Sequence, residues 1–167
     1  MSGPDARKAS FAPVVAADTR VLILGSLPGE RSLAEQRYYA HPQNRFWHLI
    51  GKAIGQELEP LGYEARLQAL LAAKVGLWDT VGSARRRGSL DAAIREAEHN
   101  RLADLAASLP ELRAVGFNGG TSARIGVPQL AGSGLELIPL PSSSPAYAAM
   151  PLAEKEKLWS ALGEFLR

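Results

Sequence analysis

The stretch Val21 to Leu24 is a short, unbroken apolar run that stops at Gly25. A strand buried on both faces has this pattern, and such strands are typical of parallel sheets covered by helices. Further short strands are predicted at Val75 to Trp78, Arg113 to Phe117 and Leu135 to Leu140. These four candidate strands limit the fold classes open to the chain.

Helical patterns separate the candidate strands. Apolar residues recur at helical spacing from Phe46 to Ile54, and other helices are predicted over Glu64 to Ala73, Asp91 to about Ser108, Thr121 to Ile125 and Leu152 to Leu166. This alternation predicts an α/β three-layer sandwich, with a central, mainly parallel four-stranded sheet covered by helices on both faces.

The length of 167 residues fits one domain, since domains average roughly 150 residues. A hydrophobic content of 46% is sufficient for a sizeable core. We expect residues 1–18 to form a tail that docks loosely through Phe11 and Val14-Val15. Residues 19–167 would then form a single domain.

Composition excludes several kinds of site and partner. The chain has no cysteine, which excludes disulfides, thiol catalysis and thiolate-held metals, and its three histidines are scattered. No apolar run approaches the roughly 20 residues of a membrane span. We therefore expect a soluble, cytoplasmic, monomeric protein that needs no metal or cofactor. The formal charge of +2 does not by itself indicate a nucleic-acid partner.

Small and polar residues follow each predicted strand. The four loops are Gly25 to Gly29, Asp79-Thr80, Asn118 to Gly120 and Pro141 to Pro145. In open parallel sheets, ligands bind outside the carboxyl ends of the strands. The sequence therefore predicts a binding site formed by these loops.

Two of these regions resemble motifs of the uracil-DNA glycosylase superfamily. The segment from Gly25 through Tyr38-Tyr39-Ala40-His41-Pro42-Gln43-Asn44-Arg45-Phe46-Trp47 is similar to its first motif, and Leu140 to Ala146 resembles its second. The hypoxanthine (deoxyinosine) and mismatch-specific branches are the most similar, whereas the iron-sulfur branches use four cysteines that this chain lacks.

The resemblance implies site residues. Asn44 matches the catalytic asparagine of the hypoxanthine branch, while Leu27 stands where better-known branches carry Asp or Asn, and Tyr39 matches the aromatic that stacks on the base. The implied base-binding residues are Gly25, Ser26, Leu27, Tyr39 and Asp79. The implied DNA-binding residues are Ser142, Ser143, Ser144, Ala146 and Tyr147.

Chemistry adds to these roles and leaves alternatives open. An Asp79 carboxylate could accept the N1-H of hypoxanthine or the N3-H of uracil, or it could simply cap the following turn. The run Arg85-Arg86-Arg87 could bind DNA phosphates, although such runs are more often solvated surface. Asn44 could equally sit in the first turn of a helix without any catalytic role.

The expected function is that of a monofunctional DNA glycosylase. It would flip hypoxanthine or uracil out of DNA and hydrolyse its glycosidic bond, leaving an abasic site for base excision repair. The alternative is a catalytically weak DNA-binding module of the same fold that recognises damaged or mismatched DNA. A nucleotide-binding enzyme is a weaker third interpretation, because the chain has neither GxGxxG nor a Walker lysine pattern.

Overall fold

The computed structural model describes residues 7–167. Its central sheet has the strand order β3-β2-β6-β7, and each neighbouring pair is parallel. The strands are β2 (Val21–Gly25), β3 (Val75–Asp79), β6 (Ala114–Asn118) and β7 (Glu136–Leu140). The predicted parallel α/β sheet is confirmed, and each strand bound lies within one residue of the predicted one.

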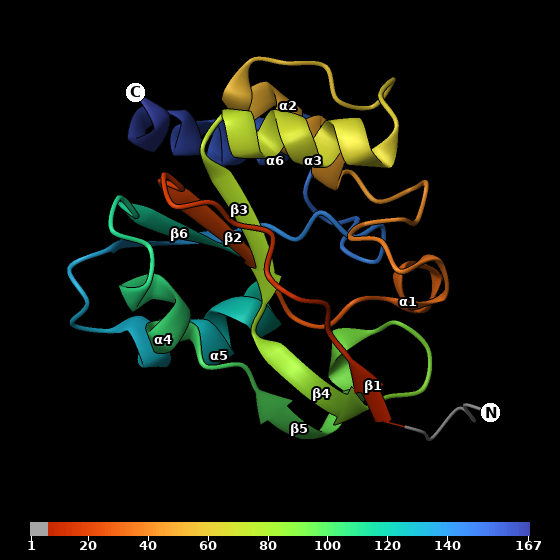
Figure 1. Cartoon of the computed structure of the whole chain (residues 1–167). Helices are drawn as coiled ribbons and strands as arrows, with labels where there is room; N and C mark the ends of the chain where they lie inside the picture. Colours follow the sequence, from red (N-terminus) through yellow and green to blue (C-terminus); the bar gives the residue numbers. More distant parts are fainter. Residues whose placement is uncertain (1–6) are drawn as a thin grey trace.

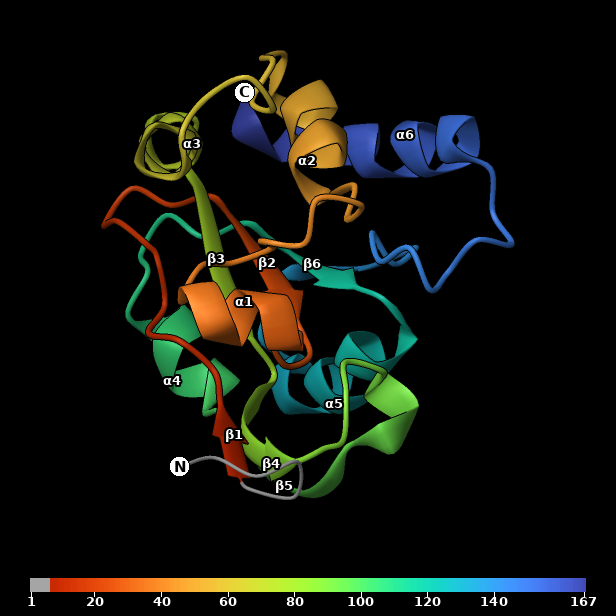
Figure 2. The same ribbon diagram turned by 90° about the vertical axis from the view of Figure 1, so that its right-hand side faces the viewer.

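Helices cover both faces of this sheet (Figures 1 and 2). One layer holds α2 (Phe46–Ile54), α3 (Tyr63–Ala72), α6 (Leu152–Ser160) and the 3-10 helix η2 (Ala161–Leu166). The other layer holds α4 (Leu102–Ala107) and α5 (Gly120–Leu130). The short α1 (Glu30–Glu35), which the sequence analysis did not predict, follows the loop after β2.

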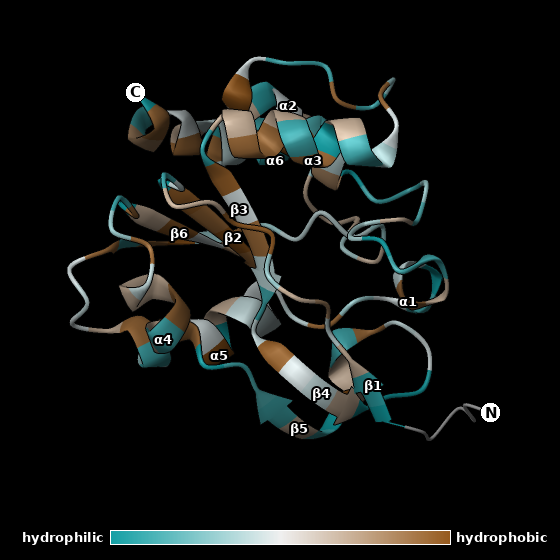
Figure 3. Cartoon of the chain, in the orientation of Figure 1, coloured by the Kyte–Doolittle hydropathy of each residue, from teal (hydrophilic) through white to brown (hydrophobic). Residues whose placement is uncertain are grey.

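Strand β2 supplies the centre of both halves of the core. Val21 and Ile23 pack toward α2 and α6, while Leu22 and Leu24 pack toward α4 and α5, and all four side chains are fully buried. Figure 3 shows this strand as hydrophobic between the two helical layers. Burial on both faces explains why its sequence does not alternate with polar residues.

A second, antiparallel sheet has the order β1-β4-β5. It comprises β1 (Arg7–Ala9), β4 (Val81–Arg85) and β5 (Arg95–His99), with the short 3-10 helix η1 (Asp91–Ala93) preceding β5. Only Thr80 separates β3 from β4, so the chain passes directly from one sheet to the other. The antiparallel hairpin of β4 and β5 therefore lies at the carboxyl end of β3.

The predicted helix from Asp91 to Ser108 is therefore wrong over most of its length. Only Leu102–Ala107 is α-helical, and Arg95–His99 pairs with β4 instead. Arg, Glu and Ala favour helices intrinsically, but the pairing between β4 and β5 overrides this preference. All five residues of β5 are exposed, which removed the apolar alternation that identifies a strand.

The segment before β2 packs on the domain. Val14 pairs with Leu77 by two backbone hydrogen bonds of 2.9 Å, and Phe11 packs on Tyr38. Phe11 and Val14 thus contact the domain and Arg7–Ala9 pairs with β4, whereas residues 1–6 of the predicted tail lie outside the described residues. Over residues 7–167, no helix is long and apolar enough to cross a membrane.

Candidate functional site

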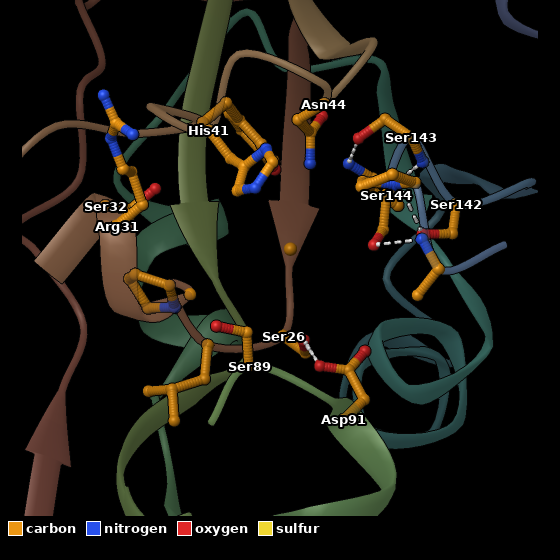
Figure 4. A pocket seen from close by; sticks show the side chains of 18 of the residues that line it. Ser26, Arg31, Ser32, His41, Asn44, Ser89, Asp91, Ser142, Ser143 and Ser144 are labelled. Carbon is orange, nitrogen blue, oxygen red and sulfur yellow. Dashed lines mark hydrogen bonds between the residues drawn. The ribbon is translucent and has the colours of Figure 1, made fainter. Parts of the chain in front are cut away.

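A pocket of about 440 Å³ opens where the carboxyl ends of β2, β3 and β6 meet. Its volume is within the range of small-molecule sites. Figure 4 shows side chains from the two motif regions converging on it. The sequence-predicted residues that line it are Gly25, Ser26, Leu27, Tyr39, Asn44, Asp79, Ser142, Ser143, Ser144, Ala146 and Tyr147.

Gly25 lines the pocket at the end of β2, at a position where a side chain would not fit. A Cβ atom at this position would lie 2.6 Å from Asp79 Oδ1 and 2.9 Å from the Tyr39 hydroxyl. The absence of a side chain lets both polar groups approach the same backbone. Within the described part of the chain, neither Asp79 Oδ2 nor the Tyr39 hydroxyl has a hydrogen-bond partner, although both atoms are buried.

The Asp79 carboxyl is only 3% exposed. Its pKa is raised to about 7, first because burial disfavours the charged form and then because Asp91 lies nearby, while the Arg86 guanidinium lowers it. Near neutral pH the group can therefore act either as an acceptor or, when protonated, as a donor. A buried carboxyl with an unused oxygen and a raised pKa is typical of a functional site.

Asn44 lies immediately before α2, at the mouth of the pocket. Its Oδ1 accepts a hydrogen bond of 2.9 Å from the amide of Phe46, the first residue of the helix, so Asn44 supports the helix start from the position before the N-cap residue Arg45. This bond also fixes the orientation of the side chain, and Figure 4 shows the amide nitrogen directed into the pocket. Support of the helix start and a role in the site are therefore compatible for this residue.

The two tyrosines of the first motif differ in their surroundings. Tyr38 is 3% exposed and donates from its hydroxyl to the Ala12 carbonyl at 3.0 Å, so it packs into the fold. Tyr39 is half-buried and adopts a left-handed φ of 53°. Its ring stacks on Phe46 with centroids 3.8 Å apart and planes 11° from parallel. Burial raises the pKa of the Tyr39 hydroxyl, and the nearby Asp79 raises it further.

Asn118, at the end of β6, connects the loop from Pro141 to Pro145, the serine-rich loop, to the sheet. Its Nδ2 donates to Ser143 Oγ at 2.8 Å, and its Oδ1 accepts from the Ser143 amide at 2.9 Å. The Ser143 carbonyl in turn accepts from the Arg45 amide at 3.0 Å. Ser143 is 1% exposed, so this predicted DNA-binding residue joins the two motifs to each other.

The neighbouring serines stabilise the turn of the same loop. Ser142 Oγ accepts from the Ser144 amide at 3.1 Å, and Ser144 Oγ accepts from the Ala146 amide at 3.2 Å. Both hydroxyls retain a hydrogen to donate. Tyr147 is 41% exposed, and Lys155 holds it through a 2.7 Å bond to its carbonyl and a position 5.1 Å from its ring centre.

Asp91 is a pocket residue that the sequence analysis missed. It lies in η1, and its Oδ1 accepts a hydrogen bond of 2.5 Å from the Ser26 hydroxyl (Figure 4). Burial raises the pKa of this carboxyl, while the Ser26 bond and Arg86 lower it. No local pattern marks Asp91, because its contact with Ser26 depends on how the hairpin folds over the first loop.

Arg86 is misassigned as a DNA contact by the sequence analysis. Its side chain is 2% exposed and donates to the carbonyls of Leu27, Pro28 and Gly88. A buried guanidinium whose donors are taken by backbone oxygens cannot reach a phosphate. Arg86 instead connects the loop after β2 to the hairpin.

The other two arginines of the run are exposed and lie outside the pocket lining. Arg85 Nε lies 2.6 Å from Glu96 Oε2 across the hairpin. Leu27 contributes to the lining, yet its side chain is 6% exposed and packs against Val81, Ala84 and Ile125. His41, which belongs to the first motif, also lines the pocket (Figure 4).

These groups can bind a flat heterocycle that presents N-H groups and polarise a water molecule beside it. The lining residues between 7 and 167 include no lysine, so the pocket offers no amine to form a Schiff base. Within the same range, no group of three or more His, Asp or Glu residues could hold a metal ion.

Three comparisons place the chain among known proteins. Residues 12–163 match the family model described as "Uracil DNA glycosylase superfamily". A protein of Methanosarcina barkeri named "Hypoxanthine DNA glycosylase" is 42% identical over 140 residues, covering 84% of this chain and 88% of that protein. One of the same name from Methanosarcina acetivorans is 39% identical over 155 residues, covering 93% and 97%.

A solved structure agrees with these relatives. The solution NMR structure of a candidate uracil DNA glycosylase from Methanosarcina acetivorans superposes with a TM-score of 0.86 at 39% identity. The match covers 96% of this chain and 98% of that one. The similarity thus includes the sheet, both helical layers and the loops that form the pocket.

Proposed function

Because the chain belongs to the uracil DNA glycosylase superfamily, we propose that it is a monofunctional DNA glycosylase that removes hypoxanthine or uracil and leaves an abasic site. One observation carries the assignment to this pocket. The two motif regions meet around a cavity whose buried polar atoms, Asp79 Oδ2 and the Tyr39 hydroxyl, have no partner among the described residues. A base that enters the cavity would supply those partners.

Asp79 would recognise the base. As a carboxylate it accepts the N1-H of hypoxanthine or the N3-H of uracil, whereas the corresponding nitrogen of adenine or cytosine has no hydrogen. Adenine or cytosine would therefore leave a buried carboxylate unpaired, which strongly disfavours both bases. Tyr39 would stack on the base with the ring face opposite Phe46, an interaction of about 1–3 kcal/mol.

Asn44 would position the water that attacks C1′ of the sugar. Its Oδ1 is held by the Phe46 amide and its Nδ2 is directed into the pocket, so Nδ2 can donate a hydrogen bond to the water oxygen and hold the water in place. An amide is not a base at neutral pH, hence the contribution of Asn44 is placement and polarisation. The glycosidic bond would break largely before the water loses its proton.

The DNA backbone would lie across the serine-rich loop. Ser142 and Ser144 can still donate to phosphate oxygens, and Ser143 would hold the loop at the correct distance from the pocket. Ala146 and Tyr147 would enter the space beside the flipped nucleotide, and the exposed Arg85 and Arg87 would contact phosphates further along the strand. We also propose that the protein acts as a monomer in the cytoplasm, at the nucleoid if the cell is bacterial, without a metal or cofactor.

The test is an excision assay on duplexes that contain hypoxanthine, uracil, xanthine or thymine. The wild type should release hypoxanthine or uracil, and Asn44→Ala should do so about a hundredfold more slowly. Asn44→Ser is the matched control, because a serine hydroxyl can still accept from the Phe46 amide. It should unfold at nearly the wild-type temperature and yet excise as slowly as Asn44→Ala.

Two results would contradict the proposal. Full activity in Asn44→Ala would exclude this residue from the reaction. Tight binding to a deaminated duplex without any abasic product, at an excess of wild-type protein, would instead favour the DNA-binding module. The buried Leu27, at a position where other branches carry Asp or Asn, is the feature that makes this second outcome worth measuring.

A further inference from the structure

Leu90 is a large apolar residue left in solvent at the mouth of the pocket. It is 59% exposed, more than any other large hydrophobic side chain among residues 7–167. Tyr147 is the next exposed hydrophobic residue in the pocket lining, whereas Leu61 and Leu158 are exposed elsewhere. Single exposed apolar residues are common on protein surfaces, but Leu90 also belongs to the lining of the pocket, next to the space that a flipped nucleotide would occupy.

The residues on either side of Leu90 are firmly held. Ser89 Oγ accepts from the Glu30 amide at 2.9 Å, and Asp91 accepts from the Ser26 hydroxyl at 2.5 Å. Arg86 donates to the Gly88 carbonyl at 2.8 Å and reaches the loop after β2 with its other nitrogens. The leucine is thus presented in a fixed position relative to the pocket floor, which lowers the entropy lost when it binds a partner.

The segment that carries Leu90 lies on a different side of the pocket from the serine-rich loop. Figure 4 shows Ser89 on one side and Ser142 to Ser144 on the other, with the cavity between them. Tyr147 belongs to the second side, because its amide donates to the Ser144 carbonyl at 3.1 Å. A nucleotide drawn into the cavity would therefore have one exposed apolar side chain on each side of it.

Resting on the proposed function, we propose that Leu90 is a second wedge, which enters the duplex beside the flipped nucleotide from the side opposite Tyr147. Flipping leaves a gap between flat, apolar base faces, and an inserted aliphatic side chain fills it. While Leu90 occupies the gap, the extruded base cannot return to the stack. Its partner is the paired base stack of duplex DNA, and a single strand has no base pairs whose gap it could fill.

The experiment compares excision of hypoxanthine from a duplex and from the same strand alone, under single-turnover conditions. Leu90→Ala should slow duplex excision by about tenfold or more and leave single-strand excision within about twofold of wild type. Leu90→Met keeps apolar bulk and should retain the duplex rate. Leu158→Ala removes a leucine of similar exposure outside the pocket lining and should match wild type on both substrates.

A second measurement tests the same proposal if the wild type does not excise hypoxanthine from single strands. With 2-aminopurine beside the lesion, wild-type binding should raise its fluorescence as the stack opens, and Leu90→Ala should bind with little rise. Equal loss on both substrates would make Leu90 a wall of the base pocket, and no loss on either would leave it without a role, so both results overturn the wedge. If the wild type neither binds nor excises, the proposed function itself fails.

Discussion

Replacing Asp79 with asparagine tests whether a buried carboxylate at this position lowers the free energy of unfolding. The carboxyl is 3% exposed, and its pKa is about 7 instead of the ordinary 3.8 because of burial and the nearby Asp91. The folded state therefore binds this proton more tightly than the unfolded chain does. The contribution of Asp79 ionisation to the free energy of unfolding is constant below pH 3.8, decreases as the pH rises toward 7 and is constant again above that.

The size of the effect follows from the shift. About three pKa units at about 1.4 kcal/mol each give a loss of about 4 kcal/mol at pH 8, and about 2 kcal/mol at pH 5. Asparagine does not ionise, so D79N escapes this loss. The free energy of unfolding of D79N, relative to wild type, should therefore increase by about 2 kcal/mol between pH 5 and pH 8.

Urea unfolding of both proteins at several pH values between 5 and 8 measures this difference. The exposed Asp18 supplies the control, since Asp18→Asn should change stability little at any pH. D79N should at the same time lose its preference for hypoxanthine, because the amide nitrogen donates where the carboxylate accepted. A stability difference that is the same at every pH would refute the argument from the buried carboxyl.

Two further substitutions address the framework of the site. Gly25→Ala should abolish excision and destabilise the protein, because the added Cβ would lie 2.6 Å from Asp79 Oδ1. An active variant would show that the Asp79 side chain can move to make room for the added methyl group. Arg86→Met should lower the free energy of unfolding by about 3 kcal/mol, because it leaves the Leu27 and Pro28 carbonyls without their donor. Calorimetry measures this loss, and Arg85→Ala, a substitution at an exposed position, is the control. Equal losses of stability in the two variants would contradict the buried role of Arg86.

The central sheet could be predicted because its information is local. Val21 to Leu24 are each in contact with one of two apolar layers, so every position of the strand had to be apolar. The motif residues were accessible through the resemblance, which singled out Asn44, and the serine loop also follows a predicted strand. Parallel strands bring their carboxyl ends together whatever the distance between them along the chain.

The hairpin could not be predicted, and with it the roles of Arg86 and Asp91. β5 is fully exposed and rich in helix-forming residues, so neither its hydrophobic pattern nor its propensities indicate a strand. Arg86 in an Arg-Arg-Arg run has the sequence signature of surface charge. Its burial arises because the fold places the Leu27 and Pro28 carbonyls where a guanidinium can reach both.

The hairpin formed by β4 and β5 also sets the electrostatics of the carboxyl groups in the pocket. Arg86 lowers the pKa of both Asp79 and Asp91, so it keeps two neighbouring carboxyl groups from being fully neutralised by burial. Asp91 has a hydroxyl donor in Ser26, whereas Asp79 Oδ2 has no partner in the described structure. In the proposed function, the unsatisfied group is thus the one that would accept the N-H of the base. A site that is electrostatically incomplete until that hydrogen arrives favours a deaminated base over adenine or cytosine, because only the former removes the unpaired charge.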